Sequence, residues 1–210
     1  LTFLVAGPET TSGALSFLLY YLSRNPEVLA KAQAETDELL GDDPDAEPTF
    51  EQVPHSRYLR RCLEETLRLW PTAPAFARSP RETTTIAAGT EYEAVMRPED
   101  WALVILPMMH RDPKAWGPTA NKFDPDRFLP ENSRGRMKNI YKPFGTGERS
   151  CIGRQFAIHE AILVLARLLH RYDITGDPAY ELTIDERLTI VPKGLQLKLT
   201  RRDRQAVHSH

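Results

Sequence analysis

The stretch FGTGERSCIG, residues 144–153, indicates what the rest of this chain is folded around. It places three glycines, an arginine and one of the two cysteines directly before a long apolar helical pattern. Because glycine has no Cβ atom, Gly145, Gly147 and Gly153 allow the backbone to pass close to a bulky ligand. Cys151 precedes the N-terminus of the expected helix, where free N–H groups favour the thiolate form of its side chain. The stretch therefore predicts a loop shaped around a ligand.

The chemistry of Cys151 and Arg149 indicates which ligand this is. A lone cysteine is most often a small buried apolar residue, but the glycines and the neighbouring Arg149 favour a metal ligand here. A thiolate is a known ligand of haem iron, and a guanidinium is suited to hold a carboxylate such as a haem propionate. We therefore expect Cys151 to bind haem iron and Arg149 to contact the propionates.

The composition argues against several other classes of protein. The 210 residues are 41% hydrophobic and 27% charged, as in ordinary globular proteins. The 27 lysines and arginines nearly balance the 29 acidic residues, so we expect no nucleic-acid partner. Two cysteines do not make a disulfide framework, and a reducing, cytoplasmic compartment fits best. The uncharged stretch from Thr10 to Ser23 is too short to span a bilayer, so we expect no membrane segment within these residues.

The hydrophobic pattern predicts a mainly α-helical fold with small β-sheets. The first expected helix, from Leu1 to about Arg24, is apolar nearly all round and is therefore predicted to be buried, as is a helix from Ile152 to about His170. Two further helices are expected over residues 27–40 and 57–70.

Strands are expected towards the middle and the end of the chain. Residues 83–86 and 102–106 have the composition of strands in one small sheet. Residues 188–191 and 195–199 alternate around a Pro-Lys-Gly turn, which is typical of a hairpin. Residues 113–144 are expected to be irregular with one short helix, and so long a connection is usually functional.

A glutamate and an arginine lie three residues apart in the helix expected over residues 57–70. Glu65 and Arg68 share one helix face and can form an ion pair. An exposed pair of this kind contributes about 0.3 to 0.5 kcal/mol. Removing one partner of a buried pair costs roughly 3 to 5 kcal/mol. The exposed and buried alternatives therefore predict very different losses of stability on mutation.

A second polar group, Glu9 and Thr10, follows Gly7 inside the first apolar helix. Polar groups in such a helix are unfavourable unless they serve a purpose. The alternative for Thr10 is a hydrogen bond back to the carbonyl four residues earlier, which leaves Glu9 unexplained.

These motifs together resemble those of the cytochrome P-450 family. Residues 144–153 match the family's haem-binding loop, F-x-x-G-x-R-x-C-x-G, at every fixed position, of which Phe144 is the first. ETLR at 65–68 matches its E-x-x-R motif, and FDPDRF at 123–128 resembles its later P-E-R-F element. The resemblance implies the C-terminal portion of that fold. Residues 1–210 would form one partial domain, with the N-terminal half and any reductase domain absent, as the start of Leu1 within a helical pattern also suggests.

The resemblance assigns roles to the polar residues. Cys151 would be the axial ligand of haem b, and Arg127 would join the Glu65–Arg68 pair in a structural network that pins the irregular segment beneath the haem. The pair Glu9 and Thr10 would deliver protons to iron-bound dioxygen. Pro8 is a departure, because the most similar members of the family have histidine there, and it either widens the helix groove by a deeper kink or marks sequence drift.

Similarity extends over essentially the whole chain and is closest to the self-sufficient fatty-acid hydroxylases, in which haem and reductase domains are fused. It implies a haem-thiolate monooxygenase that inserts one oxygen atom from dioxygen into an apolar, fatty-acid-like substrate. NADPH, FAD and FMN would act only through a fused or separate flavin reductase. The residues expected to line the substrate channel, each with core packing as an equal alternative, are Ala6, Ala73, Ala75 and Leu188.

Two other functions stay open at this point. A peroxygenase or isomerase could use the same thiolate without external electrons, although Glu9 and Thr10 argue for oxygen activation. A non-catalytic haem-binding protein or remnant fragment is the alternative from a different class, and Pro8 is one observation that motivates it.

Overall fold

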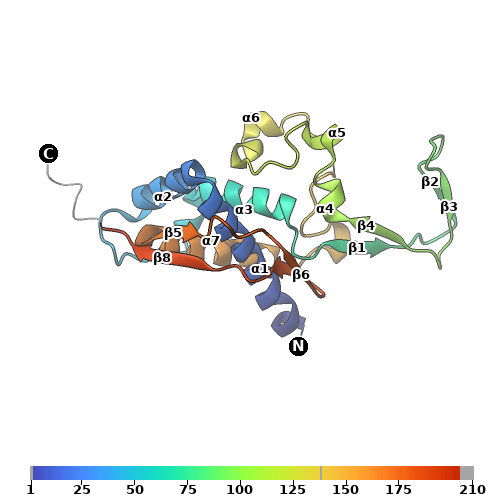
Figure 1. Ribbon diagram of the computed structural model, residues 1–210. Helices are drawn as coiled ribbons and strands as arrows, with labels where there is room; N and C mark the ends of the chain where they lie inside the picture. The colour runs from blue at the N-terminus through green and yellow to red at the C-terminus, as the bar shows by residue number, and fades with distance from the viewer. Residues whose placement is uncertain (1, 138, 204–210) are drawn as a thin grey trace.

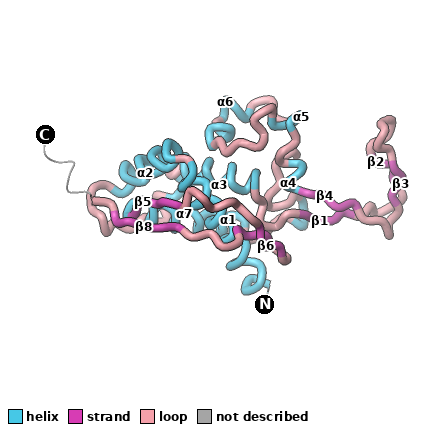
Figure 2. Tube along the Cα trace, in the orientation of Figure 1, coloured by secondary structure: helices cyan, strands magenta, loops and turns pink. Residues whose placement is uncertain are grey.

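The computed structural model describes residues 2–137 and 139–203, which form a body of packed helices with a narrow two-stranded arm at one end (Figure 1). The long helices are α1 (Thr2–Arg24), α2 (Pro26–Leu40), α3 (Arg57–Leu69) and α7 (Arg154–Arg171). Most of the remaining helical turns are short and come between residues 106 and 149; the tube drawing shows several of them in a loop-rich lobe above the long helices (Figure 2). The expected mainly α fold with small sheets is confirmed.

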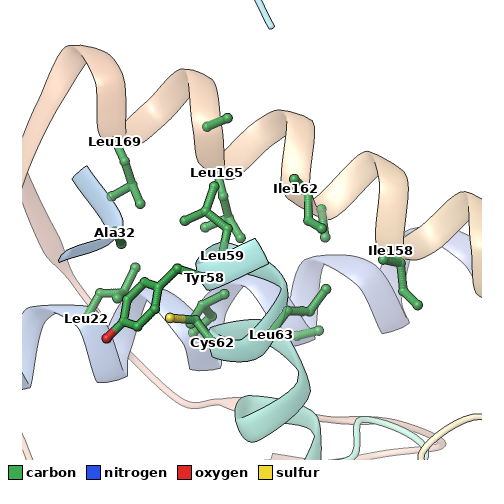
Figure 3. Packing of buried hydrophobic residues seen from close by; sticks show 14 of the residues in the cluster. Leu22, Ala32, Tyr58, Leu59, Cys62, Leu63, Ile158, Ile162, Leu165 and Leu169 are labelled. Carbon is green, nitrogen blue, oxygen red and sulfur yellow. The ribbon is translucent and has the colours of Figure 1, made fainter. Parts of the chain in front are cut away.

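The core lies where α1, α2, α3 and α7 meet. Figure 3 shows Ile158, Ile162, Leu165 and Leu169 of α7 facing Leu59 and Leu63 of α3 and Leu22 of α1. These α7 residues recur at intervals of three and four, so they form one stripe along the helix. Burying a leucine or isoleucine side chain contributes roughly 1.5 to 3 kcal/mol, so this stripe fixes α7 against the other helices.

The helix boundaries follow from local chemistry. Pro26 occupies the first turn of α2, where its missing N–H is not needed. Glu35 of α2 accepts hydrogen bonds from the backbone N–H groups of Tyr58 (2.6 Å) and Leu59 (2.9 Å), and so caps the N-terminus of α3 from another helix. The last helix begins at Arg154 rather than at the expected Ile152, which is 87% exposed.

The first helix is less buried than its composition predicts. Ala6, Gly7, Pro8 and Glu9 are exposed, and the buried positions of α1 begin at Gly13. Pro8 lies inside α1, which continues through it. The helix is apolar all round in sequence but buried along one side, and Leu1 lies outside the described residues. None of the described helices is long and apolar enough to cross a membrane.

The strands form four separate antiparallel pairs, and two of the expected pairings are wrong. Strand β2 (Thr84–Ile86) pairs with β3 (Ala94–Met96) to make the arm, whereas β4 (Ala102–Ile105) pairs with β1 (Ala75–Arg78). The stretches 83–86 and 102–106 therefore belong to different sheets.

The expected hairpin between 188–191 and 195–199 does not form. Strand β7 (Ile190–Pro192) pairs with β6 (Ile184–Glu186), and β8 (Leu197–Arg201) pairs with β5 (Tyr172–Gly176). Ile174 and Ile190 are buried, so each strand meets its partner where it can cover the helical core. Burial against α1 and α7 decides these pairings, and the local turn does not.

The segment expected to be irregular contains more helical turns than the one predicted. It holds α5 (Pro113–Trp116), η2 (Pro125–Phe128) and α6 (Pro130–Ser133), each begun by a proline. Similar short turns occur at η1 (Val53–His55), α4 (Leu106–Met109) and η3 (Gly147–Arg149). Long stretches without regular pairing remain between these turns, and their backbone groups need other hydrogen-bond partners.

Candidate functional site

The structure brings Glu65, Arg68 and Arg127 together in a buried network. Glu65 and Arg68 are completely buried, and Arg68 donates to both carboxylate oxygens of Glu65, at 2.6 Å from Nε and 2.8 Å from Nη2. Arg127 Nε lies 3.3 Å from Glu65 Oε1, and the backbone N–H of Asp124 donates to the same oxygen at 2.9 Å. The network therefore joins α3 to the turn η2, which is 60 residues further along the chain.

Arg68 is satisfied at each of its five N–H groups. Besides the two bonds to Glu65, it donates from Nη1 to the carbonyl oxygens of His110 (2.7 Å) and Ala120 (2.6 Å) and from Nη2 to that of Lys122 (3.1 Å). A guanidinium has five donors, and a buried donor without a partner is unfavourable. Arg68 thus stabilises irregular chain that has no helix or sheet ladder of its own.

Arg127 extends the same support towards α5. It donates to the carbonyl oxygens of Trp116 (3.1 Å) and Thr119 (3.0 Å). Together the two arginines bind five backbone carbonyls between residues 110 and 122. The two arginines thus attach the irregular segment to Glu65 of α3.

His110 links the network to the cysteine loop, and sequence reasoning missed it. Its side chain is fully buried, with Nδ1 3.1 Å from the carbonyl oxygen of Arg68, and Nε2 accepts from the backbone N–H of Lys142 at 3.0 Å. An accepting Nε2 requires the proton on Nδ1, which then donates to Arg68. Burial, followed by the charge of Arg68, lowers the pKa of His110 to about 4, so the ring is neutral near pH 7. No motif in the sequence marks His110, because both of its partners lie far away in the chain.

Two further bonds hold the loop in place. The hydroxyl of Tyr141 donates to the carbonyl oxygen of Glu64 on α3 (2.9 Å), and Arg78 of β1 donates to that of Thr146 (3.2 Å). The backbone N–H of Cys151 donates to the carbonyl oxygen of Phe144 at 2.9 Å and closes the loop. The chain that enters the glycine-rich stretch is thus attached to α3, and the first half of the stretch is attached to β1.

The loop presents its cysteine at the surface. Gly145 and Gly147 have φ angles of 67° and 74°, a region that L-residues rarely adopt, so glycine is needed at both positions. The side chains of Cys151 and Arg149 are exposed, and a Cβ atom at Gly153 would lie 3.9 Å from Cys151 Sγ. A flat ligand can therefore approach Cys151 without displacing the core.

Thr10 of α1 has a partner in its own helix, and Glu9 has a partner far away in the chain. Thr10 Oγ1 donates to the carbonyl oxygen of Ala6 at 2.8 Å, which is the bond to the preceding helix turn considered above as the alternative. Glu9 Oε2 accepts from the hydroxyl of Thr189 at 3.2 Å, which supplies the partner that the sequence did not reveal. Glu9 therefore points to the turn between β6 and β7.

A hollow lined mostly by apolar and small residues separates α1 from the loop and α7. It is lined by Thr10, Thr11 and Ala14 of α1, by Phe144, and by Ala157 and Ala161 of α7, among others. Small and apolar side chains suit a flat apolar group. Within the described residues no group of three or more histidine, cysteine or acidic side chains could hold a bare metal ion. Cys151 does not itself line this hollow; it is joined to the lining through Phe144, whose carbonyl oxygen accepts a hydrogen bond from the Cys151 N–H.

The four residues expected to line a substrate channel are not gathered in this hollow. Ala6, Ala73 and Leu188 are exposed, with Leu188 82% exposed, and Ala75 is half-buried. None of them lines the hollow between α1 and α7.

Comparison with known proteins points to one family. The family model described as Cytochrome P-450 matches residues 1–199. The chain is 44% identical over 209 residues to the bifunctional cytochrome P-450/NADPH–P-450 reductase 1 of Bacillus subtilis (strain 168), covering all of this chain and 19% of that protein. It is 44% identical over 206 residues to the self-sufficient cytochrome P-450 monooxygenase CYP505E1 of Aspergillus niger, covering 98% and 18%.

A solved structure gives the same result for the fold. The crystal structure of a cytochrome P-450, CYP102L1, superimposes with a TM-score of 0.90 at 44% sequence identity, covering 96% of this chain and 44% of that one. The chain thus spans about a fifth of the length of the curated relatives it matches.

Proposed function

We propose, because this chain belongs to the cytochrome P-450 family, that it forms the thiolate side of the haem site in a monooxygenase. Haem is the cofactor of the family, and when bound through a cysteine thiolate it supplies the chemistry of dioxygen activation. The observation that carries the proposal is Cys151, an exposed thiol on a glycine-rich loop that α3, His110 and β1 hold in place.

The residues around Cys151 would position the haem. Arg149, exposed beside the thiol, would bind a propionate through its guanidinium. Phe144 lines the hollow next to α1 and would contact the macrocycle, while Gly145, Gly147 and Gly153 leave room for it. Glu65, Arg68 and Arg127 would take no part in the chemistry. They would stabilise the irregular segment that supports the cysteine loop.

Thr10, which lines the hollow, would position a water molecule there, and Glu9, which lies one residue before it and outside the hollow, would exchange protons with water. The Thr10 hydroxyl is engaged by the carbonyl of Ala6, so it can accept a hydrogen bond from water while its own proton stays on the helix. Glu9 is held by Thr189 and can exchange a proton with water through its other oxygen. Well-placed proton transfer contributes typically 10² to 10⁴-fold to a rate.

The names of the relatives support a flavin reductase as the electron source, and a fatty-acid-like substrate is part of the proposal. A fatty-acid-like substrate would meet the small or apolar side chains Ala6, Ala73, Ala75 and Leu188. Electrons would come from NADPH through the FAD and FMN of a flavin reductase, as the names of the bifunctional relatives suggest.

The test is the spectrum of the haem-loaded chain. The purified chain, reconstituted with haem, reduced and exposed to carbon monoxide, should show the red-shifted band that a thiolate ligand produces. Cys151→Ser should remove this band, because a serine hydroxyl does not supply a thiolate.

The control is Cys62→Ser, which changes the other cysteine, buried in α3. It should keep the red-shifted band in the fraction that folds. A thiolate band that survives in Cys151→Ser, or its absence from the unmodified chain, would contradict the proposal.

A further inference from the structure

The network around Glu65 carries more positive than negative charge. Arg68 and Arg127 both pair with this one carboxylate. A third guanidinium, that of Arg136, stacks on the rings of Trp116 (4.6 Å) and Phe128 (4.9 Å) in the same region. Within residues 2–137 and 139–203, no carboxylate lies within ion-pair distance of Arg136.

The surroundings of Arg136 are unfavourable for a cation. Its pKa is lowered, first by partial burial and then by the positive charge of Arg127, and the charge of Glu65 offsets this only in part. Arginine nevertheless keeps its proton in proteins. The folded chain therefore holds a half-buried charge that an anion would neutralise.

A hollow of about 250 Å³ adjoins this cation. It is lined by Arg127, Asn132, Arg134 and Arg136, together with Trp116. A water molecule takes up about 30 Å³ in the liquid, so the hollow has room for a tetrahedral oxyanion and several waters. Three guanidiniums around one small hollow make it attractive to negative charge.

Trp116 gives an independent indication of a ligand. Its side chain is only 5% exposed, and its Nε1 atom is buried without a hydrogen-bond partner among the described residues. The indole N–H can only donate, and buried donors are nearly always paired. Because Trp116 also lines the adjoining hollow, an acceptor bound there is a candidate partner for this N–H.

We propose that this hollow binds an oxyanion of the phosphate type, held by Arg134, Arg136 and the indole N–H of Trp116. Arg136 Nη2 already donates to the carbonyl oxygen of Arg127, so Arg136 offers its remaining N–H groups to the anion. Arg134 supplies paired donors, and the indole supplies one more. The anion would balance the charge of the network and order residues 132–136, which run from α6 past the hollow. The source of the phosphate is either the free ion or the phosphate group of a larger ester.

The test is titration of the 210-residue chain with inorganic phosphate at constant ionic strength, followed by calorimetry and by thermal unfolding. Phosphate should raise the Tm in a saturable way, because a ligand of the folded state stabilises it by mass action. Trp116→Phe keeps an aromatic ring but removes the N–H, and it should weaken phosphate binding about tenfold. Arg134→Gln, at an exposed position, should also weaken it about tenfold.

The matched control is Arg81→Gln, an exposed arginine at the base of the arm, which should bind phosphate like the unmodified chain. Glycerol phosphate serves as the second arm. Tighter binding of the ester would identify the phosphate group of a larger molecule, and tighter binding of inorganic phosphate would identify the free ion. Equal stabilisation by chloride, or unchanged binding in Arg134→Gln, would overturn the proposal even if Trp116→Phe did not fold.

Discussion

The Glu65–Arg68 network and the cysteine loop, residues 144–153, are attached to each other but differ in the burial of their key side chains. Arg68 is completely buried and every one of its N–H groups has a partner. Cys151 is exposed, and its side chain contributes nothing to the core. The difference shows that the buried polar hydrogen bonds stabilise the segments that support the cysteine loop. The side chain of Cys151 itself stays exposed.

This division follows from what irregular backbone requires. Residues 110–122 contain few regular hydrogen-bonded elements, so their carbonyls need donors from elsewhere. Arg68 and Arg127 supply those donors, and Glu65 holds the two arginines in place. A buried ion pair is weak evidence of stability by itself, but here it replaces the missing secondary structure.

The largest effect is expected from removing the shared carboxylate. Glu65→Ala leaves the buried guanidinium of Arg68 without its counter-charge, and should lower the free energy of unfolding by about 3 to 5 kcal/mol. Urea unfolding followed by circular dichroism measures the change.

Glu64→Ala is the matched control, because Glu64 is the neighbouring residue but pairs with the partly exposed Arg60. It should change the free energy of unfolding by less than about 1 kcal/mol. Equal losses in the two variants would mean that the Glu65 network has no special part in stability.

The second effect concerns His110, whose ring joins Arg68 of the network to Lys142, which precedes the cysteine loop. The pKa of this histidine is about 4 in the folded chain and about 6.5 when unfolded. Between these values the unfolded state binds the extra proton, so the free energy of unfolding is fully retained above pH 6.5 and falls as the pH is lowered towards 4. Each pH unit corresponds to about 1.4 kcal/mol, so the whole loss is on the order of 3 kcal/mol.

His110→Asn separates this titration from that of the carboxylates. Asparagine offers a donor and an acceptor but does not titrate in this range. Urea unfolding at several pH values from 4 to 7 should therefore show a shallower loss for the variant. Parallel curves for the two proteins would exclude His110 as the cause.

The sequence predicts the local parts of this site and misses the distant ones. The loop at 144–153 and the Glu65–Arg68 pair are short motifs whose geometry depends on nearby residues, so both could be read directly. The partners of His110 are 32 and 42 residues away in the chain. Nothing in the periodicity of the sequence specifies such a pairing.

The strand errors have a similar origin. Alternation correctly marked residues near 190 and 197 as extended, but alternation does not identify a partner. The true partners, YDITG at 172–176 and IDE at 184–186, are polar and short, and they carry a weak strand signal.

For Thr10, the helix itself supplied the partner, while the partner of Glu9 lies 180 residues away.

The smallest effect is expected at the ligand itself. Cys151→Ser alters an exposed side chain outside the hydrophobic core, so the free energy of unfolding in the absence of haem should change by less than about 0.5 kcal/mol. Cys62→Ser provides the contrast, because it places a hydroxyl among the buried side chains of α1, α3 and α7 and should cost about 1 to 3 kcal/mol. Urea unfolding of both variants measures the difference. If Cys151→Ser lost as much stability as Cys62→Ser, the cysteine loop would have to be part of the core, and its separation from the supporting network would be wrong.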